Sequence, residues 1–245
     1  MPECPSILIA REAIAPVCKG KKITAVSGNA KIDMNKLAGK KIIDILSWGK
    51  HLLICLPGFT VRIHFLMFGT YSIDEKIRED RSVRLAITMG KRKLFFYTCS
   101  VRLIEQDLDE VYDWEADLLN KKWNAVKAKK KLKALPNTMA CDAILDQNIF
   151  AGAGNIFKNE VLYRVHVHPE SRIKNIPARK VAEIVTETHN YAYDFLKWKK
   201  AFVLKKHWLA HTKKTCLRCD LPFVKKHCGK TKRRSFFCTN CQVKY

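Results

Sequence analysis

The chain has 245 residues, enough to bury a real core in one large domain or two modest ones. Its 46 Lys and Arg against 23 Asp and Glu give a formal net charge of +23 and a sequence pI of about 9.7, which indicates an anionic partner, either nucleic acid or an acidic membrane surface. No apolar run reaches the roughly 18 residues that a membrane span needs, and no signal peptide is recognisable.

The first predicted element is a helix over residues 5–15, where Ile7, Ala10 and Ile14 recur at helical spacing. From about residue 22 to 103 the pattern is that of β-structure, with short β-branched and aromatic runs between turn-like pairs such as Pro57-Gly58. Strands are predicted around Val26 and at residues 42–46, 51–56, 60–65, 71–73, 83–88 and 93–97. Short strands at near-regular spacing favour a sandwich or barrel.

Acidic residues collect between residues 106 and 115, and we place a domain boundary there. Helical periodicity follows at residues 118–135, 138–147, 155–165 and 177–204, before a cysteine-rich tail from Thr215. The sequence therefore predicts an α+β protein with three parts, residues 1–115, 116–212 and 213–245.

Two Cys-x-x-Cys pairs in this tail predict a structural zinc site. Cys216 and Cys219 form one pair, Cys238 and Cys241 the other, and 18 residues separate the pairs. Two such turns facing each other complete a tetrahedral cage of four thiolates, which leaves no open position for catalysis. Cys228, beside His227, is a rival ligand without a paired turn. The other five cysteines have no ligand spacing and are expected to be small buried hydrophobes in a cytosolic or nucleoid-associated protein.

Two further segments suit anions. The basic stretch between the cysteine pairs contains Arg233, which on a hairpin tip can grip a phosphate with two hydrogen bonds; the alternative is a solvated tip. Gly152 and Gly154 predict a tight turn that leads into a helix, with Asn155 as its cap. Free backbone N–H groups at such a helix start bind anions.

The N-terminal residues Met1, Pro2 and Glu3 carry the candidate chemistry. If Met1 is removed, Pro2 becomes a free secondary amine that titrates near pH ~8 and can act as a nucleophile, with a carboxylate beside it to move protons. Taken alone, these residues favour an ordinary chain terminus, because many chains begin with Met-Pro.

Four motifs together resemble the formamidopyrimidine-DNA glycosylase and endonuclease VIII family of base-excision repair enzymes, over the whole length of the chain. They are Met1-Pro2-Glu3-x-Pro5, residues 49–53, the DQxxxAGxGNIFxxExL stretch of residues 146–162, and Arg233 ahead of the last cysteine pair and Gln242. The resemblance implies an N-terminal antiparallel β-sandwich and a C-terminal helix-two-turn-helix domain with a zinc ribbon. It also implies that DNA lies in a cleft between them.

The resemblance also implies residue roles. Pro2 would attack C1′ of the damaged nucleoside, Glu3 would be the general acid and base, and Lys50 would complete the catalytic group. Lys50, with Asn155 and Arg233, would hold the phosphates around an everted nucleotide, and β- and then δ-elimination would cleave the strand. The chain departs from the family at Cys4, usually glycine, and at Ser6, usually glutamate, which puts rate or substrate range in doubt.

The preferred lesion is expected to be an oxidised pyrimidine rather than 8-oxoguanine. The contiguous Leu66, Met67 and Phe68 look like the endonuclease VIII wedge, which fills the gap left by the flipped base; the alternative is plain core packing. Residues 97–102 lack the Arg-Arg-Phe-Gly loop that supplies wedge residues in the formamidopyrimidine branch of the family.

We therefore expect a monomeric bifunctional DNA glycosylase and apurinic-apyrimidinic lyase, with zinc as a structural cofactor. Its partner would be double-stranded DNA carrying oxidised bases or abasic sites, and not a membrane. Two alternatives stay open: a weak or inactive damaged-DNA-binding protein of the same fold, and a zinc-ribbon RNA-binding protein.

Overall fold

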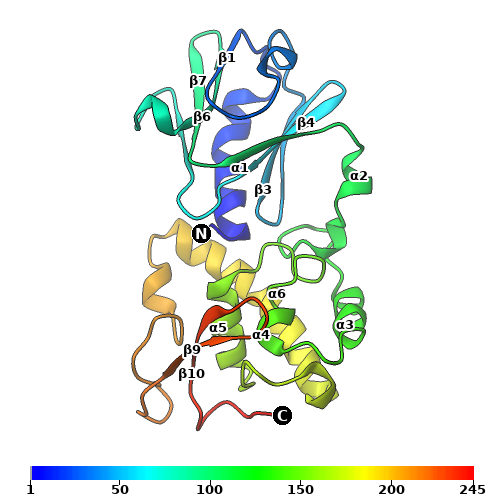
Figure 1. The fold of residues 1–245 in the computed structure, drawn as a ribbon, viewed down its shortest axis with the longest axis vertical. Helices are drawn as coiled ribbons and strands as arrows, with labels where there is room; N and C mark the ends of the chain where they lie inside the picture. The colour runs from blue at the N-terminus through cyan, green and yellow to red at the C-terminus, as the bar shows by residue number, and fades with distance from the viewer. Residues whose placement is uncertain (1) are drawn as a thin grey trace. The chain divides into compact units, whose positions relative to one another are not determined.

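The computed structural model describes residues 2–245, and the expected removal of Met1 lies outside them. The chain forms two compact units, Met1–Asp113 and Trp114–Tyr245, which are described separately (Figure 1). The first is built on antiparallel sheets and the second on helices, which confirms the predicted α+β class. The division into residues 1–115, 116–212 and 213–245 stays a prediction.

The first unit packs one long helix and two four-stranded sheets around a common core. One sheet has the order β1-β6-β7-β5, the other β2-β3-β4-β8, and all their pairings are antiparallel. Apolar residues of both sheets and of the helix form one buried cluster, as in a sandwich. The elements in chain order are α1 (Cys4–Cys18), β1 (Ala25–Ser27), the 3₁₀ helix η1 (Met34–Lys36), β2 (Asp44–Trp48), β3 (His51–Leu56), β4 (Phe59–His64), β5 (Thr70–Ile73), η2 (Asp80–Ser82), β6 (Val83–Met89), β7 (Arg92–Tyr97), β8 (Ser100–Ile104) and α2 (Leu108–Val111).

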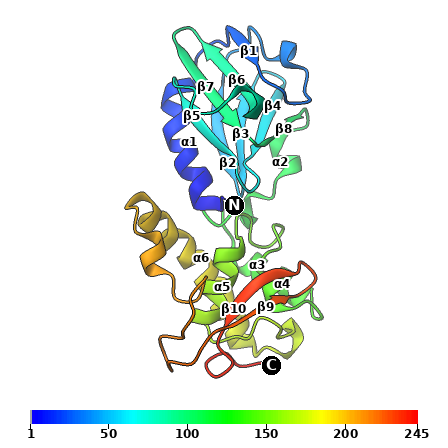
Figure 2. The same cartoon turned by 60° about the vertical axis from the view of Figure 1, so that its left-hand side comes forward.

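The helix and the seven predicted strands of this unit are all present, with ends shifted by at most three residues. Strand β8 is not among the predicted strands, because Arg102 interrupts its apolar residues. It pairs with β4 along its whole length and completes the sheet that carries β2 and β3 (Figure 2).

The second unit packs helices against a small hairpin. Its elements are η3 (Trp114–Ala116), α3 (Ala125–Lys133), α4 (Ala140–Ala143), α5 (Asn155–Arg164), η4 (Ile173–Asn175), α6 (Ala178–Lys200), η5 (Leu204–His207), β9 (Val224–Cys228) and β10 (Arg233–Phe237). Helix α6 packs on α5, with the ring of Phe157 against Tyr191 and Phe195 at centroid distances of 5.1 and 5.7 Å.

Two predicted helices are too long. Helix α3 begins only at Ala125, because Asn124 caps it by accepting a hydrogen bond from the Lys127 N–H, and because Asp117 and Asn120 turn the preceding chain. Helix α4 stops at Ala143, and Asp146 then accepts the Asn148 N–H in a second such turn. Side chains that bond their own backbone compete with the helix at both places.

Candidate functional site

The first predicted catalytic residues lie at the start of α1. Glu3 has an extended backbone and immediately precedes the helix, and its carbonyl accepts the Ser6 N–H at 2.8 Å. Its side chain is buried, with 2% of the residue exposed, whereas Pro2 is half-buried. Pro5 occupies the first turn, where a missing N–H costs nothing. The start of the helix therefore fixes the backbone of Glu3, and Pro2 immediately precedes it.

Lys50 lies in the two-residue turn between β2 and β3. Gly49 takes a φ of 51°, which glycine adopts without strain, and the turn closes on the Trp48–His51 pair. Burial, with the positive charges of Arg62 and Lys50 among the further causes, lowers the pKa of His51 to about 3, so that this imidazole is neutral at physiological pH. Its Nδ1 lies 3.1 Å from the Tyr112 hydroxyl.

The three predicted wedge residues form the turn between β4 and β5 and are exposed. Leu66, Met67 and Phe68 are 46, 57 and 71% exposed, so the core-packing alternative is wrong. The turn is specified locally: the Gly69 N–H donates to the Phe65 carbonyl at 2.7 Å, and a Cβ at Gly69 would lie 2.2 Å from that oxygen. Exposed apolar side chains on such a turn are available to a partner.

Arg78 braces this turn from a neighbouring loop. Its guanidinium donates to the Phe68 carbonyl at 3.2 Å and lies 3.4 Å from the Thr98 hydroxyl. The sequence analysis did not single out Arg78, because nothing in the spacing links it to residues 66–68.

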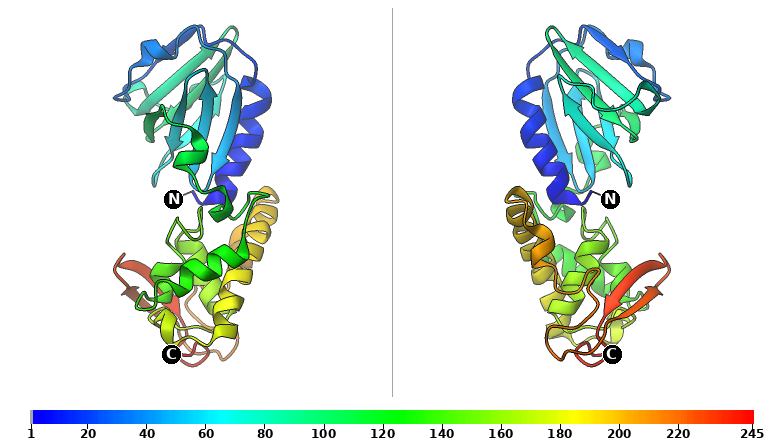
Figure 3. Two further views of the ribbon diagram at one scale, coloured as in Figure 1. Left: turned by 90° about the vertical axis from the view of Figure 1, so that its right-hand side faces the viewer. Right: turned by 90° about the vertical axis from the view of Figure 1, so that its left-hand side faces the viewer.

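These features share one end of the first unit. Strands β3 and β4 pair with His51 opposite His64, so the turn before β3 and the turn after β4 emerge at the same end of the sheet. Figures 1 and 3 show the N-terminal end of α1 at that end too. The structure therefore gathers Pro2, Glu3, Lys50 and the exposed turn there.

In the second unit, the predicted phosphate-binding residues come together where α5 meets β10. The Asn155 Nδ2 donates to the Arg234 carbonyl at 3.1 Å. Lys158 donates to the carbonyls of Arg233 and Arg234 at 3.3 and 3.0 Å, and Asn159 accepts the Phe236 N–H at 3.1 Å. Side chains of the first helical turns thus hold β10, which carries Arg233, against α5.

The predicted capping role of Asn155 is wrong. Gly154 is the residue before the helix, and Asn155 is the first helical residue. The extended Gly154 has no side chain to cap the helix, and the Asn155 amide donates to the Arg234 carbonyl of β10. Lys158, not singled out from the sequence, lies beneath the hairpin and is 1% exposed; burial lowers its pKa to about 8.

Asp142 of α4 fixes the tip of the β9–β10 hairpin. Its carboxylate accepts the backbone N–H groups of Lys230 and Thr231 at 2.8 and 3.1 Å, and the Thr231 hydroxyl at 2.9 Å. A Cβ at Gly229 would lie 2.3 Å from this carboxylate. Because 88 residues separate Asp142 from Lys230, no sequence pattern indicated the contact.

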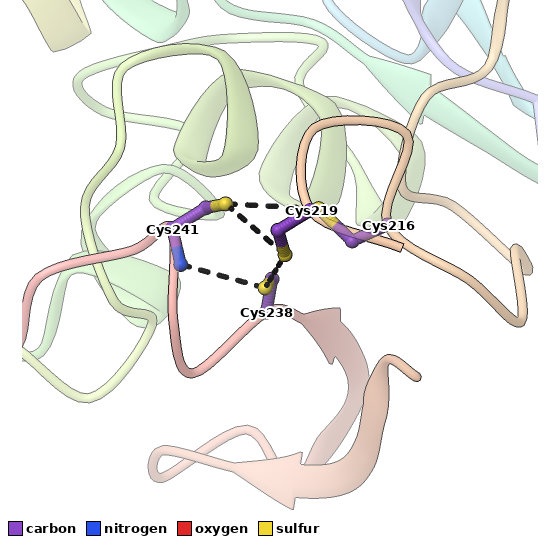
Figure 4. A group of neighbouring side chains, drawn as sticks. All are labelled: Cys216, Cys219, Cys238 and Cys241. Atoms are coloured by element: carbon purple, nitrogen blue, oxygen red, sulfur yellow. Dashed lines mark hydrogen bonds between the residues drawn. The ribbon is translucent and has the colours of Figure 1, made fainter. Parts of the chain in front are cut away.

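The four predicted zinc ligands form one cluster (Figure 4). All four sulfur atoms of Cys216, Cys219, Cys238 and Cys241 lie within 4.8 Å of one another, and three of the Sγ–Sγ separations are 3.5, 3.5 and 3.8 Å. A tetrahedron with Zn–S bonds of ~2.3 Å has edges of ~3.8 Å, so this donor set fits zinc with four protein ligands. Cys228, the rival ligand, is not part of the cluster.

The remaining cysteines behave as small apolar residues. Cys4, Cys18, Cys99 and Cys141 are buried and Cys55 is partly buried. Burial raises the pKa of the Cys99 and Cys141 thiols to about 12, so they stay protonated and unreactive at neutral pH.

Comparison with known proteins shows the family to which this chain belongs. The family model of the formamidopyrimidine-DNA glycosylase N-terminal domain matches residues 1–102, and the model of the H2TH domain of the same proteins matches residues 115–201. The chain therefore belongs to the formamidopyrimidine-DNA glycosylase family, whose members are DNA glycosylases of base-excision repair.

Individual relatives agree. The chain is 28% identical over 201 residues to Endonuclease 8-like 3 of Mus musculus, covering 79% of this chain but only 33% of that protein. It is also 28% identical to the formamidopyrimidine-DNA glycosylase of Lactobacillus helveticus, with both chains fully covered. The chain thus spans about a third of the endonuclease 8-like relatives it matches.

Solved structures show the same fold. A viral DNA glycosylase superposes with a TM-score of 0.85 at 19% identity, covering 98% of this chain and 100% of that one. The Lactococcus lactis formamidopyrimidine-DNA glycosylase bound to DNA with an abasic site gives 0.85 at 20% identity, covering 99 and 100%. Within residues 2–245, no helix has both the length and the apolar character needed to cross a bilayer.

Proposed function

We propose that this chain is a bifunctional DNA glycosylase and apurinic-apyrimidinic lyase that removes oxidised bases, pyrimidines preferentially, from double-stranded DNA. The observation that carries the proposal is that the start of α1, with Pro2 and Glu3, lies at the same end of the first unit as Lys50 and the exposed apolar turn (Figures 1 and 3). Membership in the glycosylase family supports the reaction class.

The proposed chemistry begins at Pro2 once Met1 is removed. The secondary amine attacks C1′ of an everted nucleotide, a C1′–N bond forms, and the base leaves with a proton from Glu3. Opening of the sugar ring gives an iminium, which withdraws electrons and makes the C2′ proton acidic. Loss of that proton expels the 3′ phosphate, and a second elimination expels the 5′ phosphate. Hydrolysis of the iminium then returns the free amine.

The phosphate contacts of the proposal come from both units. Lys50 would supply a point charge near the reacting sugar, and Arg233 would supply a planar fork for a backbone phosphate. Asn155 would donate beside it. Lys158 supports this assignment because its buried ammonium lies against the carbonyl of Arg233 and adds positive charge below pH 8.

Zinc has a structural place in the proposal. Bound by Cys216, Cys219, Cys238 and Cys241, the ion would cross-link the two ends of the ribbon and fix the hairpin that carries Arg233. Four sulfur ligands leave no position for substrate, so the reaction steps belong to the amine and the carboxylate.

The wedge assignment follows from exposure. Unpairing a nucleotide leaves a gap in the base stack, and apolar side chains can fill it. Leu66, Met67 and Phe68 are contiguous and exposed on one turn, as the endonuclease VIII-like arrangement requires. This supports a preference for oxidised pyrimidines.

Borohydride trapping tests the proposal. Protein shown by mass spectrometry to have lost Met1 is mixed with duplexes that carry an oxidised pyrimidine, 8-oxoguanine or an abasic site, and borohydride reduces the iminium to a stable adduct. We expect an adduct on the abasic and pyrimidine substrates that maps to Pro2. The same chain with a blocked amino terminus is the matched control and should give none. Absence of an adduct on all three substrates would reject the chemistry.

A second candidate function is a damaged-DNA-binding protein without chemistry, which Ser6 favours. This residue lies in the first turn of α1, where the family usually has a glutamate, and its N–H bonds to the Glu3 carbonyl. Such a protein would bind abasic-site DNA tightly and leave the strand intact. Replacing Ser6 with Glu should raise the excision rate if the missing carboxylate limits it.

A further inference from the structure

The C-terminal end of α6 places a phenylalanine where glycine is expected. The helix ends at Lys200, the Phe202 N–H then donates to the Lys199 carbonyl at 3.1 Å, and the Val203 N–H donates to the Trp198 carbonyl at 2.9 Å. These two bonds define a Schellman motif. Phe202 is its left-handed residue, with a φ of 59°. A bulky side chain in this conformation is a backbone outlier that costs free energy, and outliers of this kind concentrate at functional sites.

The ring of Phe202 contributes nothing to the core that would offset this strain. The residue is 97% exposed, the highest value among the exposed large hydrophobic residues of the described chain. The segment around it is nevertheless anchored: the ring of Trp198 stacks on His207 at a centroid distance of 4.2 Å and an angle of 4°. Phe202 is therefore held in solvent by an ordered turn.

Positive charge surrounds the ring. Five lysines lie between residues 197 and 206, and no Asp or Glu occurs from residue 195 to residue 219. An exposed aromatic ring among cations is the combination that binds unpaired nucleotides, because the bases stack on the ring while the cations attract the phosphates. An apolar protein surface would instead have to desolvate these lysines.

The turn lies on the side of the second unit that already carries a proposed phosphate contact. Figures 1 and 2 both show the C-terminal end of α6 and the N-terminal end of α5 toward the same end of this unit. Asn155 is the first residue of α5. A strand held at α5 can therefore continue toward the α6 turn.

We propose that Phe202 is a stacking platform for an unpaired DNA base, and that the lysines of residues 197–206 hold the phosphates on either side. The proposal rests on the proposed function in taking DNA as the ligand. It adds a residue that distinguishes unpaired from paired nucleotides, independently of the chemistry at Pro2.

Binding of undamaged oligonucleotides tests the proposal. Fluorescence anisotropy at one salt concentration would compare a single strand with the matching duplex for the full-length wild type, F202A, F202W and V126A. Val126 is the matched control, because it is 80% exposed and lies on α3 beside a run of lysines. We expect F202A to weaken single-strand binding about fivefold or more, and duplex binding much less. F202W should retain wild-type affinity, and V126A should change neither.

F202G separates the binding role from folding. Glycine adopts the left-handed conformation without strain, so the variant should unfold at the same temperature as the wild type or higher, yet lose as much single-strand affinity as F202A. Equal single-strand affinity of F202A and wild type, an equal loss on both DNA forms, or no single-strand binding by the wild type would each overturn the proposal. Borohydride trapping at Pro2 can succeed in all three cases, so failure here is distinct from failure of the proposed function.

Discussion

Arg233 is the residue whose removal should change the salt dependence of DNA binding. Its strand is held against α5 by three side chains, which presents a half-buried guanidinium in one place. If roughly five phosphates are neutralised, the logarithm of affinity should fall against the logarithm of salt concentration with a slope of about −4 to −5. R233A should flatten this slope by about one. Salt titrations of duplex binding would measure this change in slope, with K91A in the first unit as the control. A slope for R233A identical to that of the wild type would show that Arg233 does not contact phosphate.

Arg78 should matter for base eversion without touching the reacting atoms. Its guanidinium holds the Phe68 carbonyl, so R78A frees the turn that carries the wedge candidates. Loss of this charge-assisted bond, at about 1 kcal/mol on an exposed loop, corresponds to about a fivefold lower single-turnover excision rate on duplex. A single-stranded substrate needs no wedge and should be cut at the wild-type rate.

R81A is the matched control for that experiment, because Arg81 lies in η2, in the same connection between β5 and β6, and its side chain pairs with Glu79 instead. Equal losses for R78A and R81A, or equal losses on both substrates, would contradict the bracing role.

The candidate site shows which residues a sequence can reveal. Pro2, Glu3 and Lys50 were predictable because the family motifs are short and local, and the zinc ligands because paired turns have a fixed spacing. Asp142 and Lys158 were not, since each acts on a strand more than 70 residues away. The role of Asn155 was misread because a glycine turn before a helix does not say which residue caps it.

At the scale of elements, the β9–β10 hairpin depends on its anchor in α4. D142A removes three hydrogen bonds to the hairpin tip and also removes a negative charge. Loss of the negative charge alone would make DNA binding tighter, whereas a loosened hairpin tip would make it weaker. The two effects therefore predict opposite changes in affinity. We expect affinity to fall about threefold to tenfold, in line with one or two lost hydrogen bonds, while the zinc content equals that of the wild type.

D80A removes the same charge from the first unit, where Asp80 pairs with Lys76 on the surface, and should leave affinity unchanged or slightly raised. Tighter binding by D142A would refute the anchoring role. Duplex binding by anisotropy and metal analysis of both variants provide the comparison.

Elements were predictable where one signal dominated. The β-branched and aromatic runs of strands β3, β6 and β7 and the apolar spacing of α6 gave their positions within a few residues. The short helices α3 and α4 were overextended because apolar spacing continues through segments in which Asp117, Asn120 and Asp146 turn the chain. Strand β8 was missed because Arg102 interrupts its apolar residues, and its pairing with β4 is not visible in the sequence.

At the scale of the whole molecule, each unit carries a different part of the proposed function. The first holds the nucleophile, the carboxylate and the exposed turn; the second holds Asn155, Arg233, the cysteine cluster and the Phe202 turn. Neither unit has all the parts, so the proposed reaction needs both on one DNA molecule. The pH dependence of stability concerns both units, because each contains histidines whose pKa is lowered.

Histidines make the folded chain sensitive to mild acid. Burial is the first cause that lowers the pKa of five of them, to about 3 for His51 and about 4 for His211; the others are His64, His168 and His189. Below pH ~6.5 the unfolded chain binds protons at these positions and the folded chain does not. The free energy of unfolding should therefore fall as the pH drops from about 6.5 toward 4.

His51 provides the measurable part of this effect. At pH 5 its lowered pKa alone should cost on the order of 2 kcal/mol of stability relative to pH 7.5, less what solvent screening removes. H51N keeps a polar partner for the Tyr112 hydroxyl and does not titrate. Urea unfolding at pH 7.5, 6 and 5 should show a decline that is shallower in H51N than in the wild type. Parallel curves for the two proteins, or a wild type as stable at pH 5 as at pH 7.5, would show that burial does not lower the pKa of His51 in the folded chain.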